Sequence, residues 1–402
     1  MITTINNKHN KLNVPNLRFP EFQGAWEKCI LGDITENFNL RNKDKIQYPM
    51  FSVTNDRGFV PQSEQFEGRD MVGEDIKAYK IIHTNDFAYN PARINVGSIA
   101  IYTGEKPCMI SSLYVCFKTA KEVNNEWLMQ LLKTPKMNYY YNVNGEGGVR
   151  VYLFYPNFAR IKMSIPKIEE QKKIAKLLNL LDERIATQSK IIDKLQTLIR
   201  GIMVELQKQG LKNGTWKKFI LADVLSERSE LNINLHQVFS VSVSKGVVNQ
   251  VEYLGRSFSA KDTSKYHVVH YGDIVYTKSP TGSFPYGIVK QSLNHDNVAV
   301  SPLYGVYKPK NFSTGMFLHQ YFMSEVNTLN YLHPLIQKGA KNTINITNQR
   351  FLENRVGMPI NADTLLVISQ LLRSLNYKIE YQQSLLLQYQ KQKQYLLRQM
   401  FI

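Results

Sequence analysis

Cysteine is scarce in this 402-residue chain, and long apolar runs are missing. The three cysteines, Cys29, Cys108 and Cys116, are odd in number and lack the paired spacing of metal ligands. This argues against disulfides and zinc sites and fits a reducing compartment. No apolar stretch reaches the roughly 18 residues that a membrane span needs, and the polar start MITTINNKHNK is unlike a signal peptide. We therefore expect a cytoplasmic protein without a membrane partner.

Catalytic motifs are missing as well: the chain has no P-loop pattern and no glycine-rich cofactor loop after an early strand. NPAR at Asn90 differs from the NPPY box of adenine methyltransferases, because Ala92 and Arg93 replace the groups that hold a flipped base. EDIK at Glu74 lacks the upstream Pro-Asp of a nuclease metal site, and the histidines of HVVH (267–270) fall on opposite faces of a strand. We expect no catalytic group, metal or cofactor in this chain.

Acidic residues are few relative to basic ones. The chain has 33 Asp and Glu against 50 Lys and Arg, which gives a net charge of +17. Residues 16–160 carry 17 basic and 16 acidic side chains, whereas residues 211–360 carry 16 and 9. This balance favours a polyanionic partner, with nucleic acid as the leading candidate. A charge that only keeps the protein soluble is the alternative. The hydrophobic content of 43%, with 23 Tyr and 19 Phe, predicts packed domains rather than disorder.

The chain aligns with itself at a shift of about 190 residues, far longer than the repeat of a solenoid. The matched segments keep their order: WEKCILGDI (26) with WKKFILADV (216), FSVT (51) with FSVS (239), YKIIHTNDFAYN (79) with YHVVHYGDIVYT (266), and ISSLYVCFK (110) with VSPLYGVYK (300). Two copies of one module explain this order. Each copy is therefore a domain and not a stacking element.

Each copy combines short β-branched and aromatic runs, broken by Gly, Pro, Asn and Asp, with segments of helical spacing such as EWLMQLLKTPKMNYYYN. This mixture predicts an α+β domain. We divide the chain into a first α+β domain with an N-terminal leader (1–160), a central long helix and linker (161–210), a second α+β domain (211–360) and a C-terminal long helix (361–402).

Both long helices show apolar positions in alternating steps of four and three, the spacing of a heptad seam. The predicted seam residues are Ile174, Leu178, Leu181, Ile185, Gln188 and Ile192 in the first helix and Ile368, Leu372, Leu375, Ile379, Gln382 and Leu386 in the second. Gln188 and Gln382 occupy the same slot, either as a device that fixes the register or as solvent-exposed side chains.

A 40-residue helix is about 60 Å long and needs another long helix to cover its apolar stripe. Antiparallel pairing of the two copies within one chain places the domains at opposite ends and predicts an approximate two-fold repeat. Pairing with a second chain is the alternative. Two similar but non-identical domains on a basic chain match the two-fold symmetry of duplex DNA, so we expect a split, asymmetric site.

On these features the chain resembles the specificity (S) subunit of type I restriction-modification systems, over nearly its whole length. The resemblance rests on the leader LRFPEF before Trp26, GDIVY (272–276) with NDFAY (85–89), SPLYGVYK with SSLYVCFK, and IPKIEEQKKIAKLLNLLDERI from Ile165, the most specific. The second helix departs from the family's P-x-x-x-E-Q start, since it reads PINADTLLVISQLL.

The resemblance implies a DNA-recognition subunit without catalysis of its own, in which each domain reads one half of a bipartite site and the helices set the spacing. Its implied partners are double-stranded DNA, two methyltransferase subunits that use S-adenosylmethionine, and restriction subunits that use ATP and Mg. A two-headed coiled-coil adaptor that binds only proteins is the competing hypothesis, and a large exposed apolar patch on the domains would favour it.

Candidate DNA contacts come from loops at matching places in the two copies, because recognition elements vary on a repeated scaffold. Such loops offer amide, guanidinium, ammonium and hydroxyl groups to bases and phosphates. The candidates are Asn90, Arg93 and Asn95 with Lys278, Ser279, Thr281 and Ser283 after a central strand, Arg150 with Lys338, Lys341 and Asn342 before the long helix, and the weaker pair Lys80 and His267.

Overall fold

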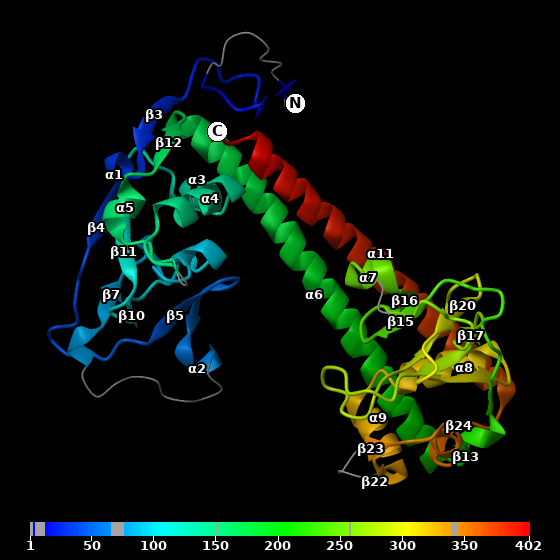
Figure 1. The fold of residues 1–402 in the computed structure, drawn as a ribbon. Coiled ribbons are helices and arrows are strands. Elements are labelled where there is room, and N and C mark those ends of the chain that lie inside the picture. The colour runs from blue at the N-terminus through cyan, green and yellow to red at the C-terminus, as the bar shows by residue number, and fades with distance from the viewer. Residues whose placement is uncertain (1–2, 5–12, 66–75, 149–150, 257–258, 339–343) are drawn as a thin grey trace. The chain divides into compact units, whose positions relative to one another are not determined.

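The computed structural model describes residues 3–4, 13–65, 76–148, 151–256, 259–338 and 344–402. It divides into two compact units, unit 1 (residues 1–188 and 385–402) and unit 2 (residues 189–384). Each unit holds an α+β domain and part of each of the long helices α6 (Ile168–Lys212) and α11 (Ala362–Gln399) (Figure 1). The division predicted from the sequence instead gives the two helices segments of their own, 161–210 and 361–402, and it stays a prediction; α6 ends two residues beyond the first of these segments.

Unit 1 is built around a four-stranded antiparallel sheet with the order β4-β11-β8-β9. Its strands are β4 (Thr35–Phe38), β11 (Val115–Thr119), β8 (Phe87–Tyr89) and β9 (Ile99–Ile101). The paired strands are β1 (Thr3–Thr4) with β2 (Leu17–Arg18), β3 (Glu27–Ile30) with β12 (Lys162–Ile165), β5 (Phe51–Thr54) with β6 (Gly58–Pro61), and β7 (Lys80–Ile82) with β10 (Cys108–Ile110). Its short helices are α1 (Leu31–Ile34), α2 (Gln62–Gln65), η1 (Ile76–Ala78), η2 (Ile94–Val96), α3 (Asn125–Leu132), α4 (Pro135–Asn144) and α5 (Tyr155–Ala159).

Unit 2 repeats this plan with the sheet order β14-β21-β18-β19. Its strands are β14 (Leu225–Glu227), β21 (Gly305–Pro309), β18 (Ile274–Tyr276) and β19 (Val289–Gln291). The paired strands are β13 (Trp216–Ile220) with β24 (Arg355–Pro359), β15 (Phe239–Ser242) with β16 (Gly246–Asn249), β17 (His267–Val269) with β20 (Val298–Val300), and β22 (Gln337–Lys338) with β23 (Ile344–Asn345). Its short helices are η3 (Leu221–Asp223), α7 (Gln250–Leu254), α8 (Phe312–Tyr321), α9 (Glu325–Leu332), η4 (His333–Leu335) and α10 (Asn348–Phe351). The predicted α+β class and internal repeat are confirmed.

Side-chain contacts repeat along with the strands. The buried Asn42 amide donates to the Ile46 carbonyl (2.8 Å) and accepts from the Ile46 N–H (3.0 Å). Asn232 makes the same two bonds to His236, at 3.2 and 2.7 Å. An amide that satisfies both backbone groups four residues on fixes the local turn. The repeat therefore extends from topology to individual hydrogen bonds.

The long helices pair in antiparallel fashion inside each unit. In unit 1 the start of α6 lies beside the end of α11, where Lys393 Nζ donates to Asp182 Oδ1 at 2.5 Å (Figure 1). In unit 2 Leu206, near the end of α6, and Ile368, near the start of α11, line one open pocket. The predicted antiparallel pairing within one chain is confirmed.

The predicted heptad seam coincides with the least exposed face of both helices. Gln188 is 7% exposed, and Gln382 is half-buried, so neither is a fully exposed side chain. The buried seam residues are Ile174, Leu178, Leu181, Gln188, Ile192, Ile368, Leu372 and Ile379, and the half-buried ones are Ile185, Leu375, Gln382 and Leu386. Across the described ranges, no helix combines the length and apolarity needed to cross a membrane.

Candidate nucleic-acid interface

The loop between β8 and β9 holds the first three candidates in a closed turn. Asn90 Oδ1 accepts from the Ala92 N–H at 3.0 Å, and the Asn90 N–H donates to the Ser98 carbonyl at 3.0 Å. Asn95 Nδ2 donates to Asn142 Oδ1 of α4 at 3.0 Å, which ties the loop to the domain. The Arg93 side chain is exposed. The loop therefore presents one exposed guanidinium on a fixed backbone.

The matching loop of unit 2 joins β18 to β19. Thr281 and Phe284 exchange two backbone hydrogen bonds of 3.0 Å, which closes a tight hairpin. Ser279 is exposed, and the exposed Ser283 donates its hydroxyl to Glu325 Oε1 of α9. Lys278 is half-buried, and burial lowers the pKa of its ammonium. The hydroxyl and ammonium groups of these candidates thus lie on a folded loop. This loop joins β18 to β19, the strands that correspond to β8 and β9 of unit 1.

The pair Lys80 and His267 occupies matching strand positions, as predicted from the repeat. Lys80 begins β7, and its Nζ donates to the Tyr114 carbonyl at 2.5 Å. Burial lowers the pKa of Lys80. His267 begins β17 and is half-buried; its Nδ1 has no hydrogen-bond partner among the residues whose placement is described. Because the Lys80 ammonium already bonds the Tyr114 carbonyl within the domain, this pair stays the weaker candidate for DNA contact.

The candidates before the long helices fall mostly outside the described residues. Arg150, Lys341 and Asn342 lie in the undescribed ranges, and Lys338 is described only as backbone in β22. The bases of both loops are closed in the same way. Glu146 and Tyr152 exchange backbone hydrogen bonds of 2.8 Å, and β22 pairs with β23. The structure therefore describes the anchors of these loops and leaves their contacts as predictions.

Two hairpins beside these loops were missed by the sequence analysis. In unit 1 the Ser98 hydroxyl donates to the Val53 carbonyl of β5 at 2.7 Å, which joins the β8–β9 loop to the β5–β6 hairpin. The equivalent hairpin in unit 2 is β15–β16. The signal was present, since FSVT and FSVS are each followed by a basic residue and glycine, Arg57-Gly58 and Lys245-Gly246.

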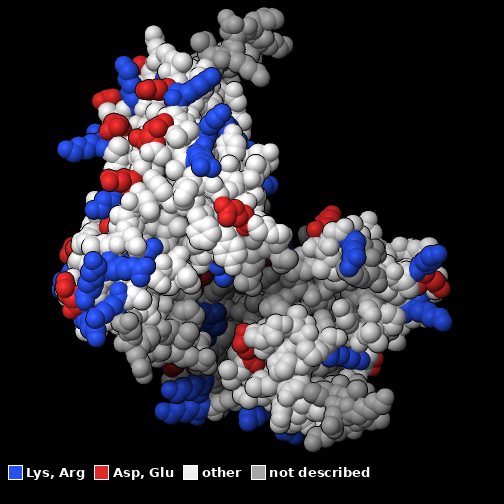
Figure 2. Space-filling view, turned by 60° about the vertical axis from the view of Figure 1, so that its left-hand side comes forward, with Lys and Arg blue, Asp and Glu red and all other residues white. Residues whose placement is uncertain are grey.

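The surface charge is interspersed on the face drawn in Figure 2. Lys and Arg side chains lie in small groups among Asp and Glu, and most of this face is uncharged. The net charge of +17 therefore does not form one continuous basic sheet on this face. Binding to a polyanion would depend on particular basic residues at defined positions rather than on a uniform field.

The leader packs against the first turn of α6 through a buried ion pair. Arg18 Nε and NH2 donate to the two oxygens of Glu170 at 2.8 and 2.7 Å, and both residues are at most 5% exposed. Trp26 Nε1 donates to the same carboxylate at 3.3 Å. In α11 the corresponding turn carries Asp363, which is exposed. The departure of the second helix start from PKIEEQ thus removes this anchor from unit 2.

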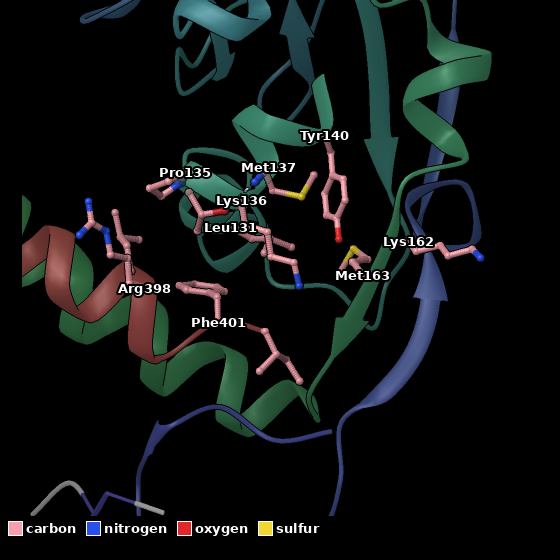
Figure 3. Close-up of a pocket in the computed structure, with 12 residues that line it drawn as sticks. Leu131, Pro135, Lys136, Met137, Tyr140, Lys162, Met163, Arg398 and Phe401 are labelled. Carbon is pink, nitrogen blue, oxygen red and sulfur yellow. Dashed lines mark hydrogen bonds between the residues drawn. The ribbon is translucent and has the colours of Figure 1, made fainter. Parts of the chain in front are cut away.

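The chain's last residues close a small apolar pocket of about 130 Å³ in unit 1. Figure 3 shows the side chains of Leu131, Met137, Met163 and Phe401 gathered around it from α3, α4, β12 and the C-terminal segment. The Phe401 ring lies 6.0 Å from the Trp127 ring. Such packing anchors the end of α11 to the first domain.

Comparison with known proteins finds similarity mainly over part of the chain. Residues 25–197 match the model of the type I restriction modification DNA specificity domain. The putative type I restriction enzyme MjaX specificity subunit of Methanocaldococcus jannaschii is 24% identical over 240 residues, 57% of this chain and 56% of that protein. The type I restriction enzyme MjaVIII specificity subunit of the same organism is 28% identical over 223 residues, 54% of this chain and 49% of that protein. The chain spans about half the length of these curated relatives.

The whole fold is similar to a solved structure. The crystal structure of a type I restriction-modification system S subunit from M. genitalium matches with a TM-score of 0.61, over 97% of this chain and 99% of that chain. The sequence identity is 10%, so this likeness concerns the fold. It covers both α+β domains and both long helices.

Proposed function

We propose that this chain, whose residues 25–197 belong to the family of type I restriction modification DNA specificity domains, is the DNA-recognition subunit of such a system. The observation that carries the proposal is the repeated domain. Units 1 and 2 have the same sheet order and the same anchored loop beside the sheet, yet the loop residues differ. One scaffold with two sets of exposed polar groups suits two different half-sites.

Each unit would read one half of a bipartite site, and the paired helices would set the distance between the halves. In unit 1 the exposed Arg93 supports this role, and in unit 2 Ser279 does. Arg150, Lys338, Lys341 and Asn342 remain proposed contacts on the loops before the helices. Base edges give specificity, whereas phosphate contacts fix the register.

The partners proposed for this chain are two methyltransferase subunits and restriction subunits, and it would act in the cytoplasm. The chain would position their chemistry and bind no cofactor itself, while the partners would use S-adenosylmethionine, ATP and Mg. Exposed apolar side chains on the long helices support protein docking there, such as Val204 and Val367, each 63% exposed. Such a surface favours a protein partner.

A protein-only adaptor is the second candidate, because matching exposed leucines occur on both domains. Leu113 is 76% and Leu303 72% exposed, in the equivalent turns SSLY and SPLY. Residues that are identical in both copies suit a partner that is the same for both. They can serve the docking of methyltransferase subunits equally well, so they do not displace DNA recognition.

Mapping of methylated bases across a genome tests the proposal. With intact partner genes, cells that carry this gene should methylate one bipartite motif, and deletion of the gene should abolish that motif, because the partners would no longer be directed to it. Complementation with the intact gene is the control. Methylation that is unchanged after deletion would contradict DNA recognition and favour the adaptor.

A further inference from the structure

The two units carry matching hairpins whose tips differ. The tip of β5–β6 is Asn55-Asp56-Arg57, and the tip of β15–β16 is Val243-Ser244-Lys245. Both hairpins pair over four residues in the same register, closing at Thr54 with Gly58 and at Ser242 with Gly246. We call these segments tip 1 (residues 55–57) and tip 2 (residues 243–245).

The backbone of both tips is held in the same way. Thr54 Oγ1 accepts from the Arg57 N–H at 3.0 Å, and Ser242 Oγ accepts from the Lys245 N–H at 3.3 Å. The closing glycines have φ of +68° and +74°, the left-handed conformation that ends a three-residue hairpin loop. A basic residue therefore stands at the same place on the same turn in both units.

Tip 1 forms one surface with the predicted contact loop. A Cβ on Gly97, whose φ is +102°, would lie 2.8 Å from the Asn55 carbonyl, so only glycine permits this approach. The Ser98 hydroxyl bonds the neighbouring strand at Val53. Arg93 and Arg57, both exposed, thus extend from two loops that are packed against each other.

The basic groups of the tips are available to a ligand. Among residues whose placement is described, no ion pair involves Arg57 or Lys245. Both side chains are exposed, and Lys245 Nζ lies 5.5 Å over the Tyr253 ring. An exposed cation–π contact is worth only about 0.5 to 1 kcal/mol, so it leaves the Lys245 ammonium free to exchange to a ligand. A two-stranded ribbon fits the major groove, where Arg or Lys to guanine O6 and N7 is the commonest specific contact.

We propose that tips 1 and 2 enter the major groove and that Arg57 and Lys245 each read a guanine, one in each half-site. This inference rests on the proposed function and names the residues that would give each unit its base preference. The shared scaffold explains why both half-sites are approached in the same way. The different neighbours, Asn55 and Asp56 against Val243 and Ser244, give the two units different readouts.

Methylation mapping with the assembled complex tests the tips separately. Arg57→Ala should relax one guanine position in one half-site, lowering discrimination there by about 5- to 150-fold, while the other half-site and the gap stay unchanged. Lys245→Ala should do the same in the opposite half-site. Arg57→Gln should shift the relaxed position toward adenine. Lys28→Ala, an exposed lysine on β3, is the matched control and should leave the motif intact.

The possible results distinguish a failure of guanine reading by the tips from a failure of DNA recognition by the whole chain. A bipartite motif that is identical in wild type, Arg57→Ala and Lys245→Ala would overturn the inference alone. A uniform loss of methylation with an unchanged motif would show phosphate contacts and would also overturn base reading. A wild-type complex that leaves no bipartite motif would overturn the proposed function and the inference with it.

Discussion

Lys290 is a buried cation in the sheet of unit 2. It lies in β19 and is 2% exposed, and its Nζ contacts Met323 Sδ of the segment after α8. Burial lowers the pKa of Lys290 to about 8. At pH 7 Lys290 is therefore still charged in the folded state, and the desolvation of this buried charge destabilises the fold. The corresponding strand of unit 1, β9 (Ile99–Ile101), is apolar, so the fold itself does not require this charge.

Lys290→Met should raise the free energy of unfolding at pH 7 by on the order of 2 kcal/mol, because it removes the buried charge. The unfolded state binds more protons than the folded state between pH 8 and about 10.5, so wild-type stability should rise with pH across this window. The variant's advantage should therefore shrink there. Urea unfolding of both proteins at pH 7, 8 and 9.5 measures this, with the exposed Lys308→Met as control. An advantage that is constant with pH would contradict the account.

A buried long-range ion pair joins the leader strand β2 to helix α6. Arg18 and Glu170 are 152 residues apart in the sequence and form a bidentate, buried pair. A buried pair is costly to break, because the remaining charge is left without a partner. The start of α6 is therefore fixed to the first domain by a buried ion pair, whereas the first turn of α11 carries the exposed Asp363.

Glu170→Gln should lower the free energy of unfolding of the domain by about 3 to 5 kcal/mol, since it leaves the Arg18 guanidinium buried and unpaired. Asp363→Asn in the exposed first turn of α11 is the matched control and should change it by less than about 0.5 kcal/mol. Chemical denaturation followed by tryptophan fluorescence compares them, because Trp26 adjoins the pair. Equal effects of the two substitutions would show that the pair does not anchor the leader.

The long helices and the repeat were predictable from sequence because both are local or periodic signals. The steps from Ile174 to Ile192 identify the buried face of α6 before any contact is known. The Arg18–Glu170 pair could not be predicted, since no periodicity links positions 152 residues apart. The repeat of FSVT and FSVS indicates the two hairpins, but the packing of the β5–β6 hairpin against the β8–β9 loop could not be predicted, because it depends on how separate strands pack.

At the scale of the whole molecule, each unit is completed by both long helices. Unit 1 takes residues 385–402 from the end of the chain, and unit 2 takes the second half of α6. Each unit is therefore folded from segments that are distant in sequence, and the helix pair is shared between two similar domains. A recognition subunit built in this way would couple the spacing of its half-sites to helix length.

Insertion of one heptad into both α6 and α11 tests this central claim most directly. Seven residues add about 10.5 Å of helix while preserving the seam, a length of about three base pairs. Methylation mapping should therefore return both original half-sites with a gap longer by about three base pairs. A two-residue insertion into both helices is the control, since it turns the following seam positions by about 200° away from the partner helix and should disrupt the helix pair. An unchanged gap after the heptad insertion would contradict the account.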